Sequence, residues 1–338
     1  DLLNIPIQEL RLERGTLQVR SQEAGLLGRA EQIEISIENR NQELYVSVES
    51  RKAMVKRNTP KSPVAEISIA AAALLSEEEI VIRGFKITEG ESFVIGSGRI
   101  DGSIDSAKYD KIDLRTRSHL ALEPFLSTLV AIQPQIQLPS IRGVFEGDFT
   151  YLLEKGKQEP VLKAEIETED LQVTHFNIGK LTAQLEHKSN QVSAKKIGIK
   201  NAAGQVELSD SVLNLHDDMA FTATLSSPEL ELRKLLIVLG VGETPLNLEL
   251  GGQLPCQGKI KPTFGLQCTG EIRGRNFWVK ASEDKTIVAL DSFSVNGEVS
   301  VDAEAVTTKA KLHVGSSVGD ASGVIIYKKG FDIKYSTP

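Results

Sequence analysis

A strict alternation of apolar and polar residues limits, more than any other feature, how this chain can fold. Ile33, Ile35 and Ile37 are separated by single polar residues, and the same spacing recurs in about twenty segments. A period of two residues is typical of a β-strand with one buried face. Short turns rich in Gly, Asn, Asp and Ser join the segments. The sequence therefore predicts a mainly β protein, a meander of antiparallel hairpins without the helical crossovers of a parallel sheet.

Two short segments have helical spacing instead. Leu122, Phe125 and Leu126 recur at intervals of three and four residues. In the second segment Ser227 and Pro228 are expected to be the N-cap and the first residue of a helix. Both segments are amphipathic, so we expect each helix to pack as a plug or brace at the mouth of a groove formed by the strands. The alternative is a helix that lies on a membrane surface.

The two helical segments indicate an internal repeat of roughly 105 to 110 residues. Leu122 aligns with Leu232, and Leu126 aligns with Leu236. We therefore predict a first β-unit over residues 1–121, a second unit with its helix over 122–228, and a third with its helix over 229–338.

Charge and composition exclude several classes of function. The 338-residue chain carries a formal net charge of −7, so a nucleic-acid backbone is not an expected partner. The five histidines are scattered singly and have no metal-ligand spacing. The segment Gly96-Ser97-Gly98 lacks the frame of a nucleophile elbow and is expected to form a turn. The sequence therefore predicts no enzymatic activity, no cofactor and no metal.

Cys256 and Cys268 flank a predicted hairpin whose loop is Lys261-Pro262-Thr263. This register places the two cysteines opposite each other on the apolar side of the ladder. One interpretation is a cross-strand disulfide, which implies an oxidising compartment. The other is a pair of buried free thiols that fill space as small hydrophobic side chains.

An apolar face shared by so many strands has to be covered, because each exposed Val, Ile or Leu forgoes roughly 1.5 to 3 kcal/mol of burial. Two short helices are too small to cover it. Separate sandwiches would need long crossovers, whereas the chain contains mostly hairpins. We therefore expect one long sheet that curves around an apolar groove, covered by itself or by a ligand.

The C-terminal third contains a recurring order of strand, glycine and turn. It includes Leu246-Asn-Leu248-Glu-Leu250-Gly251, then Gly258-Lys-Ile260, and then Phe277-Trp278-Val279. In this pattern the chain resembles the AsmA-like superfamily, and within it the C-terminal part of TamB-type translocation and assembly proteins. The resemblance implies a β-taco, or repeating β-groove. It also implies a parent protein that is anchored in the inner membrane by a part outside this chain, crosses the periplasm of a Gram-negative cell and reaches the outer membrane.

The leading functional hypothesis is a conduit for phospholipids, whose acyl chains would lie along the apolar groove. One alternative is a scaffold or chaperone that pairs a sheet edge with strands of an outer-membrane β-barrel protein. Another is a structural β-rod with a filled interior. We expect the wall of the groove to be formed by Ile33, Ile35, Ile37, Leu44, Val46, Val48, Ile67, Ile69, Ile80, Ile82, Leu162, Ile166, Leu181, Leu185, Leu246, Leu248 and Leu250.

Overall fold

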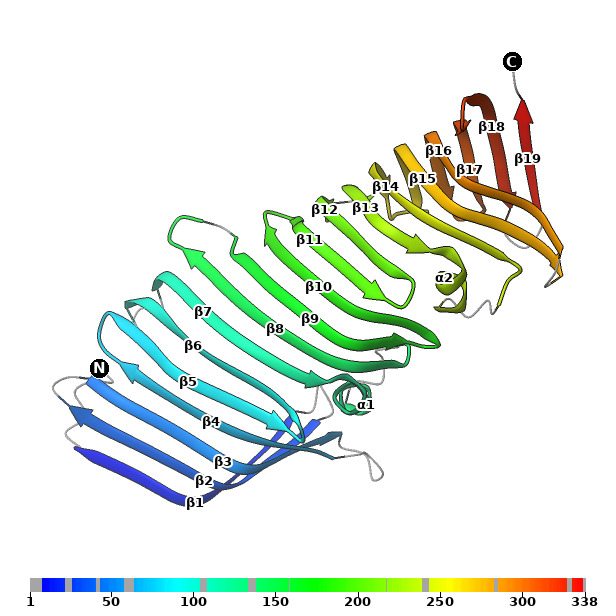
Figure 1. Ribbon diagram of the computed structural model, residues 1–338. Coiled ribbons are helices and arrows are strands. Elements are labelled where there is room, and N and C mark those ends of the chain that lie inside the picture. The colour runs from blue at the N-terminus through cyan, green and yellow to red at the C-terminus, as the bar shows by residue number, and fades with distance from the viewer. Residues whose placement is uncertain are drawn as a thin grey trace. The chain divides into compact units, whose positions relative to one another are not determined.

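The computed structural model is mainly β, with one long, open antiparallel sheet of 19 strands and two short helices (Figure 1). The predicted fold class is thereby confirmed. The residues that the structure describes are 8–21, 26–40, 43–57, 64–103, 108–132, 138–157, 159–216, 218–238, 243–282, 285–326 and 330–336.

The chain divides into two compact units, residues 1–169 and residues 170–338. The boundary falls within strand β9 (Val161–Val173). The division into three parts that follows from the repeat stays a prediction.

Unit 1 is a meander in which each strand pairs antiparallel with the next, from β1–β2 through β7–β8. Antiparallel neighbours can be joined by short connections, which agrees with the short turns predicted from the sequence. The strands are β1 (Glu9–Ser21), β2 (Leu26–Arg40), β3 (Glu43–Arg57), β4 (Ala65–Leu75), β5 (Glu79–Glu89), β6 (Ser92–Ser103), β7 (Lys108–Ala121) and β8 (Ile141–Glu154).

Unit 2 repeats this arrangement from β10 to β19, again with consecutive antiparallel pairs. The turn between β10 and β11 shows why local sequence forms hairpins. Its central residues Ser189 and Asn190 both have positive φ, 49° and 56°, as a type I′ turn requires. The strands are β10 (Phe176–Lys188), β11 (Gln191–Asn201), β12 (Gly204–Asn214), β13 (Ala220–Glu231), β14 (Leu246–Lys259), β15 (Gly265–Ser282), β16 (Lys285–Asp302), β17 (Ala305–Val314), β18 (Ser317–Ile326) and β19 (Gly330–Ser336).

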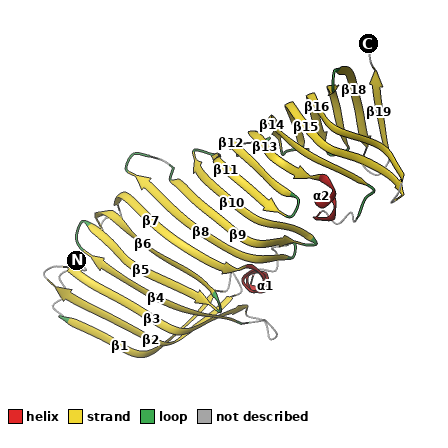
Figure 2. Cartoon of the chain, in the orientation of Figure 1, coloured by secondary structure: helices red, strands yellow, loops and turns green. Residues whose placement is uncertain are grey.

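The helices α1 (Leu122–Ile132) and α2 (Leu232–Val238) begin at the two leucines that the repeat aligns. Each one connects two strands that pair with each other, β7 with β8 and β13 with β14 (Figure 2). In unit 1, α1 contacts β3 as well as β7 and β8; in unit 2, α2 contacts β10 as well as β13 and β14. Each helix therefore reaches across several strands of its own unit, as expected for a brace.

The predicted start of the second helix is wrong, because Ser227 and Pro228 belong to β13. Ser227 pairs with Gly252 in the ladder, and its hydroxyl donates a hydrogen bond to the Gln205 carbonyl at 2.7 Å. Pro228 lies at a register shift, where the ladder does not require its missing N–H. Ser227 therefore bonds to the strands on both sides of β13, β12 and β14, and does not cap a helix.

The prediction of a turn at Gly96-Ser97-Gly98 is also wrong, since these residues lie within β6. Gly96 is paired with Phe85 of β5, and Gly98 with Leu114 of β7. Glycine in a strand interior commonly marks a close approach of a neighbouring group.

The turn between β16 and β17 depends on a single carboxylate. Asp302 Oδ1 accepts hydrogen bonds from the backbone N–H groups of Glu304 at 2.7 Å and Ala305 at 2.8 Å. These two bonds hold the pKa of the Asp302 carboxyl below its ordinary value of 3.8.

We therefore expect Asp302→Ala to speed hydrogen exchange at the Glu304 and Ala305 amides, while Asp302→Asn, which keeps an acceptor oxygen, changes them less. Because the folded-state pKa is depressed, the carboxylate adds stability at neutral pH, and this contribution is lost as the pH falls through that pKa. Amide exchange measured across acidic pH, after correction for intrinsic rates, tests this. Equal protection of these amides in all three proteins would contradict it.

Candidate functional site

One face of the unit 1 sheet is apolar in every strand. Directly opposed residues of neighbouring strands share a face, so the register identifies its members. We call this surface the apolar face and the opposite one the polar face. One row across the apolar face, from β1 to β8, consists of Leu12, Ile35, Val48, Ala71, Phe85, Gly96, Thr116 and Phe149.

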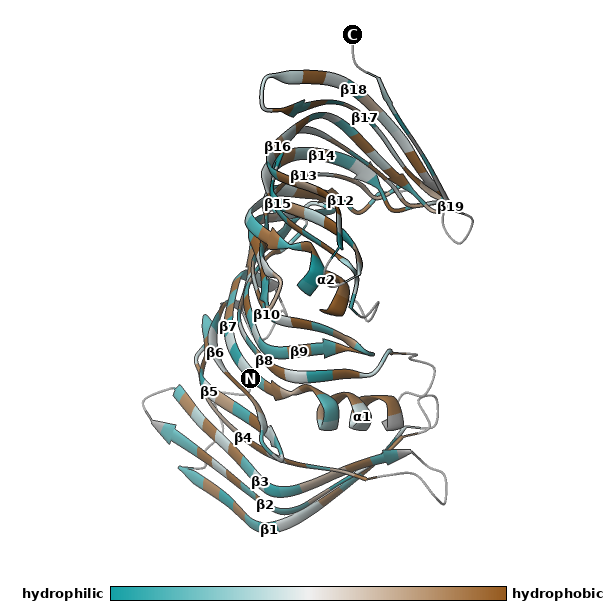
Figure 3. Cartoon of the chain, turned by 45° about the vertical axis from the view of Figure 1, so that its right-hand side comes forward, coloured by the Kyte–Doolittle hydropathy of each residue, from teal (hydrophilic) through white to brown (hydrophobic). Residues whose placement is uncertain are grey.

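Unit 2 has an apolar face of the same kind. Between β10 and β14, one row consists of Ala183, Ile197, Leu208, Leu225 and Leu254. A further row from β15 to β18 consists of Ile272, Val295, Leu312 and Gly319. Hydrophobic and hydrophilic residues alternate along the strands in Figure 3, as a sheet with two different faces requires.

The register places most predicted wall residues on these faces. In unit 1 these are Ile33, Ile35, Ile37, Leu44, Val46, Val48, Ile67, Ile69, Ile80 and Ile82. In unit 2 they are Leu181, Leu185, Leu246 and Leu250. Leu248 lies midway between Leu246 and Leu250 in β14 and shares their face by alternation. Leu162 and Ile166 occupy alternate positions of β9 and so share one face of that strand. Their role as a lipid-contacting wall stays a prediction.

Sequence alternation missed several members of the apolar face. Phe85 is an example: the register shifts between Ile82 and Phe85, so the apolar positions change from even to odd numbers along β5. Such β-bulges interrupt the period of two without a clear sequence signal.

The apolar faces are incompletely covered. The accessible surface is 21941 Å². A compact monomer of 36.9 kDa exposes about 13,600 Å², and two separate compact proteins of half that mass about 16,400 Å² in total. The accessible surface of this structure exceeds even the larger figure by about a third. Among the described residues no large side chain is fully buried, although Ile33 and Leu44 are only 7% and 5% exposed.

The buried serine hydroxyl groups on the apolar face of unit 1 form hydrogen bonds with backbone groups. Ser50 Oγ donates to the Glu31 carbonyl at 3.0 Å, and Ser118 Oγ donates to the Gly147 carbonyl at 3.2 Å. Ser92 Oγ accepts from the Ala121 N–H at 3.0 Å. In unit 2, His187 differs, because its buried Nδ1 has no hydrogen-bond partner among the residues that the structure describes. The unit 1 hydroxyls thus have their hydrogen bonds within the protein, so this surface suits an apolar occupant.

The polar face carries cross-strand ion pairs. Arg117 Nε lies 2.8 Å from Asp148 Oδ1, and Arg99 Nη2 lies 2.7 Å from Glu79 Oε2. The hydrogen bond with Asp148 is the main reason that the pKa of Arg117 is raised. Arg117, Asp148 and Arg99 are exposed and Glu79 is partly buried, so the Arg117–Asp148 pair in particular contributes little to stability and chiefly keeps this face hydrated.

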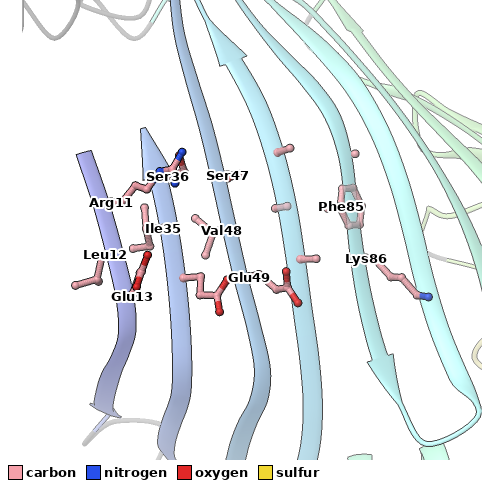
Figure 4. Close-up of a pocket in the computed structure, with 15 residues that line it drawn as sticks. Arg11, Leu12, Glu13, Ile35, Ser36, Ser47, Val48, Glu49, Phe85 and Lys86 are labelled. Carbon is pink, nitrogen blue, oxygen red and sulfur yellow. The ribbon is translucent and has the colours of Figure 1, made fainter. Parts of the chain in front are cut away.

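A shallow depression of about 610 Å³ crosses β1–β5 (Figure 4). Each strand contributes one residue of the apolar face and, on both sides of it, residues of the polar face, as in Glu34-Ile35-Ser36. Successive side chains of a strand point to opposite faces, so Glu34 and Ser36 point to the polar face and Ile35 points away from it. A depression bounded by the two polar-face side chains, with the backbone of the middle residue as its floor, lies on the polar face. This depression is therefore not the predicted apolar groove.

Cys256 and Cys268 form a disulfide, with their Cα atoms 4.1 Å apart. They are direct cross-strand partners on the apolar face of unit 2, and both are buried. The disulfide interpretation is confirmed and that of free thiols is wrong. Gly258 pairs with Leu266 in the same hairpin, as the predicted loop Lys261-Pro262-Thr263 requires.

The described residues include no cluster of three or more His, Cys, Asp or Glu side chains that could hold a metal ion. Within the same residues, no helix has the length and hydropathy needed to cross a membrane.

No protein-family model, no curated protein and no solved structure matches the chain.

Proposed function

We propose that this protein carries phospholipids, with their acyl chains against the apolar faces and their head groups in water. The observation that carries the proposal is the apolar face itself, which runs through every paired strand of each unit and stays partly exposed. A contiguous apolar surface that stays partly exposed normally marks a binding surface. An acyl chain needs a continuous apolar path and no specific hydrogen bonds. The proposal assigns the protein no catalytic step.

The proposed setting is the periplasm, in a parent protein that links the inner and outer membranes. The Cys256–Cys268 disulfide supports an oxidising compartment outside the cytoplasm. The resemblance to AsmA-like proteins agrees with this setting.

Native mass spectrometry of the protein purified from bacteria, followed by lipid extraction, tests the proposal. We expect phospholipid to be bound at about one or more molecules per chain, because each unit has its own apolar face. A mass without lipid, unchanged after incubation with phosphatidylethanolamine–phosphatidylglycerol vesicles, would overturn the proposal.

One observation favours a second function, a scaffold for outer-membrane β-barrel proteins. The first strand, β1, pairs with β2, and its apolar side chains Leu10, Leu12, Leu17 and Val19 are 46% to 56% exposed. An unfolded strand that added to β1 would cover these side chains. Hydrogen exchange with an unfolded outer-membrane protein separates the two functions, since strand addition protects β1 amides and lipid binding does not.

A further inference from the structure

Three phenylalanine rings on the apolar faces each lie over a glycine of the neighbouring strand. In every case the two residues are direct cross-strand partners. The ring therefore lies across the sheet, toward the neighbouring strand, and does not point straight up from its own strand. The pairs are Phe85 with Gly96, Phe221 with Gly258, and Phe293 with Gly274.

The rings occupy the positions that Cβ atoms would take on the glycines. A Cβ atom on Gly96 would lie 2.5 Å from Cε1 and Cζ of Phe85 and 2.7 Å from the Arg115 carbonyl oxygen. One on Gly258 would lie 2.6 Å from Phe221 Cζ and closer still to the Gly265 carbonyl oxygen. On Gly274 the three nearest atoms are Cζ, Cε1 and Cε2 of Phe293, and the first two would be closer still. A side chain in a strand usually stands roughly perpendicular to the sheet, so these rings are low only because the partner has no Cβ.

The height of a ring matters on a face that has to admit a ligand. A ring lying against the backbone contributes apolar area but leaves the space above it open. The same ring standing upright would fill that space. Because packed interiors tolerate little overlap, one raised ring is enough to displace a chain from that point of the face.

We propose that the Phe–Gly pairs are specificity-determining positions of the lipid-binding face, at which each glycine holds its ring low and so sets the depth available to an acyl chain. This inference rests on the proposed function. It assigns the glycines a role beyond strand packing, since packing alone predicts an effect on stability but none on which lipid is bound.

Gly274→Ala is the most direct test, because the three atoms nearest to the new methyl group are all ring atoms of Phe293. The ring has to rise, and we expect phospholipid affinity to fall about fivefold, or about 1 kcal/mol. The matched control is Gly265→Ala in the same strand, where a Cβ meets nothing within 4 Å. The double variant Gly274→Ala/Phe293→Leu removes the raised ring and should restore binding.

Binding is measured with the full chain, delipidated and titrated with palmitoyl-oleoyl phosphatidylglycerol, while circular dichroism monitors the fold. Wild-type binding by a folded Gly274→Ala variant would overturn the inference. A wild-type protein that binds no lipid would overturn the proposed function, and this inference with it.

Phe293→Ala provides a test if Gly274→Ala fails to fold. Without the ring the face is deeper at this point, so branched chains should fit better. We expect the affinity for diphytanoyl phosphatidylglycerol, relative to the palmitoyl-oleoyl lipid, to rise about fivefold over wild type. An unchanged ratio would show that the ring does not set the depth.

Discussion

Val46→Asp should remove bound phospholipid from this protein while leaving its β circular dichroism unchanged. Val46 lies on the apolar face of unit 1, directly between Ile37 and Ala73. A carboxylate here would have to lose water when an acyl chain covers it, so we expect lipid occupancy to fall about tenfold or more. The side chain is only partly buried, so without lipid the charge stays hydrated and the sheet stays folded.

Ser47→Asp is the matched control, because it adds the same charge one residue along β3, on the polar face between Ser36 and Ala72. We expect it to bind lipid like the wild type. If Val46→Asp unfolds the protein, its face is a closed core, as the β-rod hypothesis holds. If it folds and binds lipid normally, acyl chains do not lie on this face.

The second large effect is expected from Cys256→Ala/Cys268→Ala, which removes the only cross-link of the chain. The bond joins cysteines 12 residues apart in sequence, and a loop of this size is worth about 3 kcal/mol in the chain-entropy account. The effect should be greatest in β14 and β15, so their slowest-exchanging amides should lose about that much protection.

The neighbouring pair on the polar face is the control for this experiment. Gln257 Nε2 donates to Gln267 Oε1 at 3.2 Å, and these residues are also cross-strand partners. Replacing Gln257 alone with alanine removes this exposed hydrogen bond, keeps the bond from Gln267 Nε2 to Glu298 Oε1 at 2.7 Å, and should cost about 1 kcal/mol or less. An equal loss of protection in the two variants would mean that the disulfide adds nothing beyond an ordinary contact.

Much of the fold could be predicted because alternation is a direct consequence of strand geometry. Side chains at Ile33, Ile35 and Ile37 have to share a face in any extended strand, whatever follows them. Short polar turns then bring strands that are consecutive in the sequence together as antiparallel pairs. That Cys256 and Cys268 lie opposite each other could be predicted in the same way, by counting residues outward along both strands from the hairpin loop.

The rest depends on interactions between strands, which local sequence does not contain. Ser227 and Pro228 have the chemistry of a helix start, yet pairing with Gly252 keeps Ser227 in a strand. Gly96 has the chemistry of a turn, but it lies under the ring of Phe85 from another strand. Bulges that move apolar positions from even to odd numbers, as before Phe85, are visible only once both strands are in place.

The consecutive pairing of strands makes each unit a nearly one-dimensional object, in which a hairpin contacts little besides the hairpins before and after it. Its cooperativity should therefore resemble that of a repeat protein, in which stability sums over neighbours and damage stays local. Insertion or loss of one hairpin would change the width of a unit's sheet by about 9.6 Å, since neighbouring strands lie about 4.8 Å apart, without disturbing the register elsewhere. Under the proposed function, such a protein can be matched to the distance between two membranes by adding or removing hairpins, with no redesign of a central core.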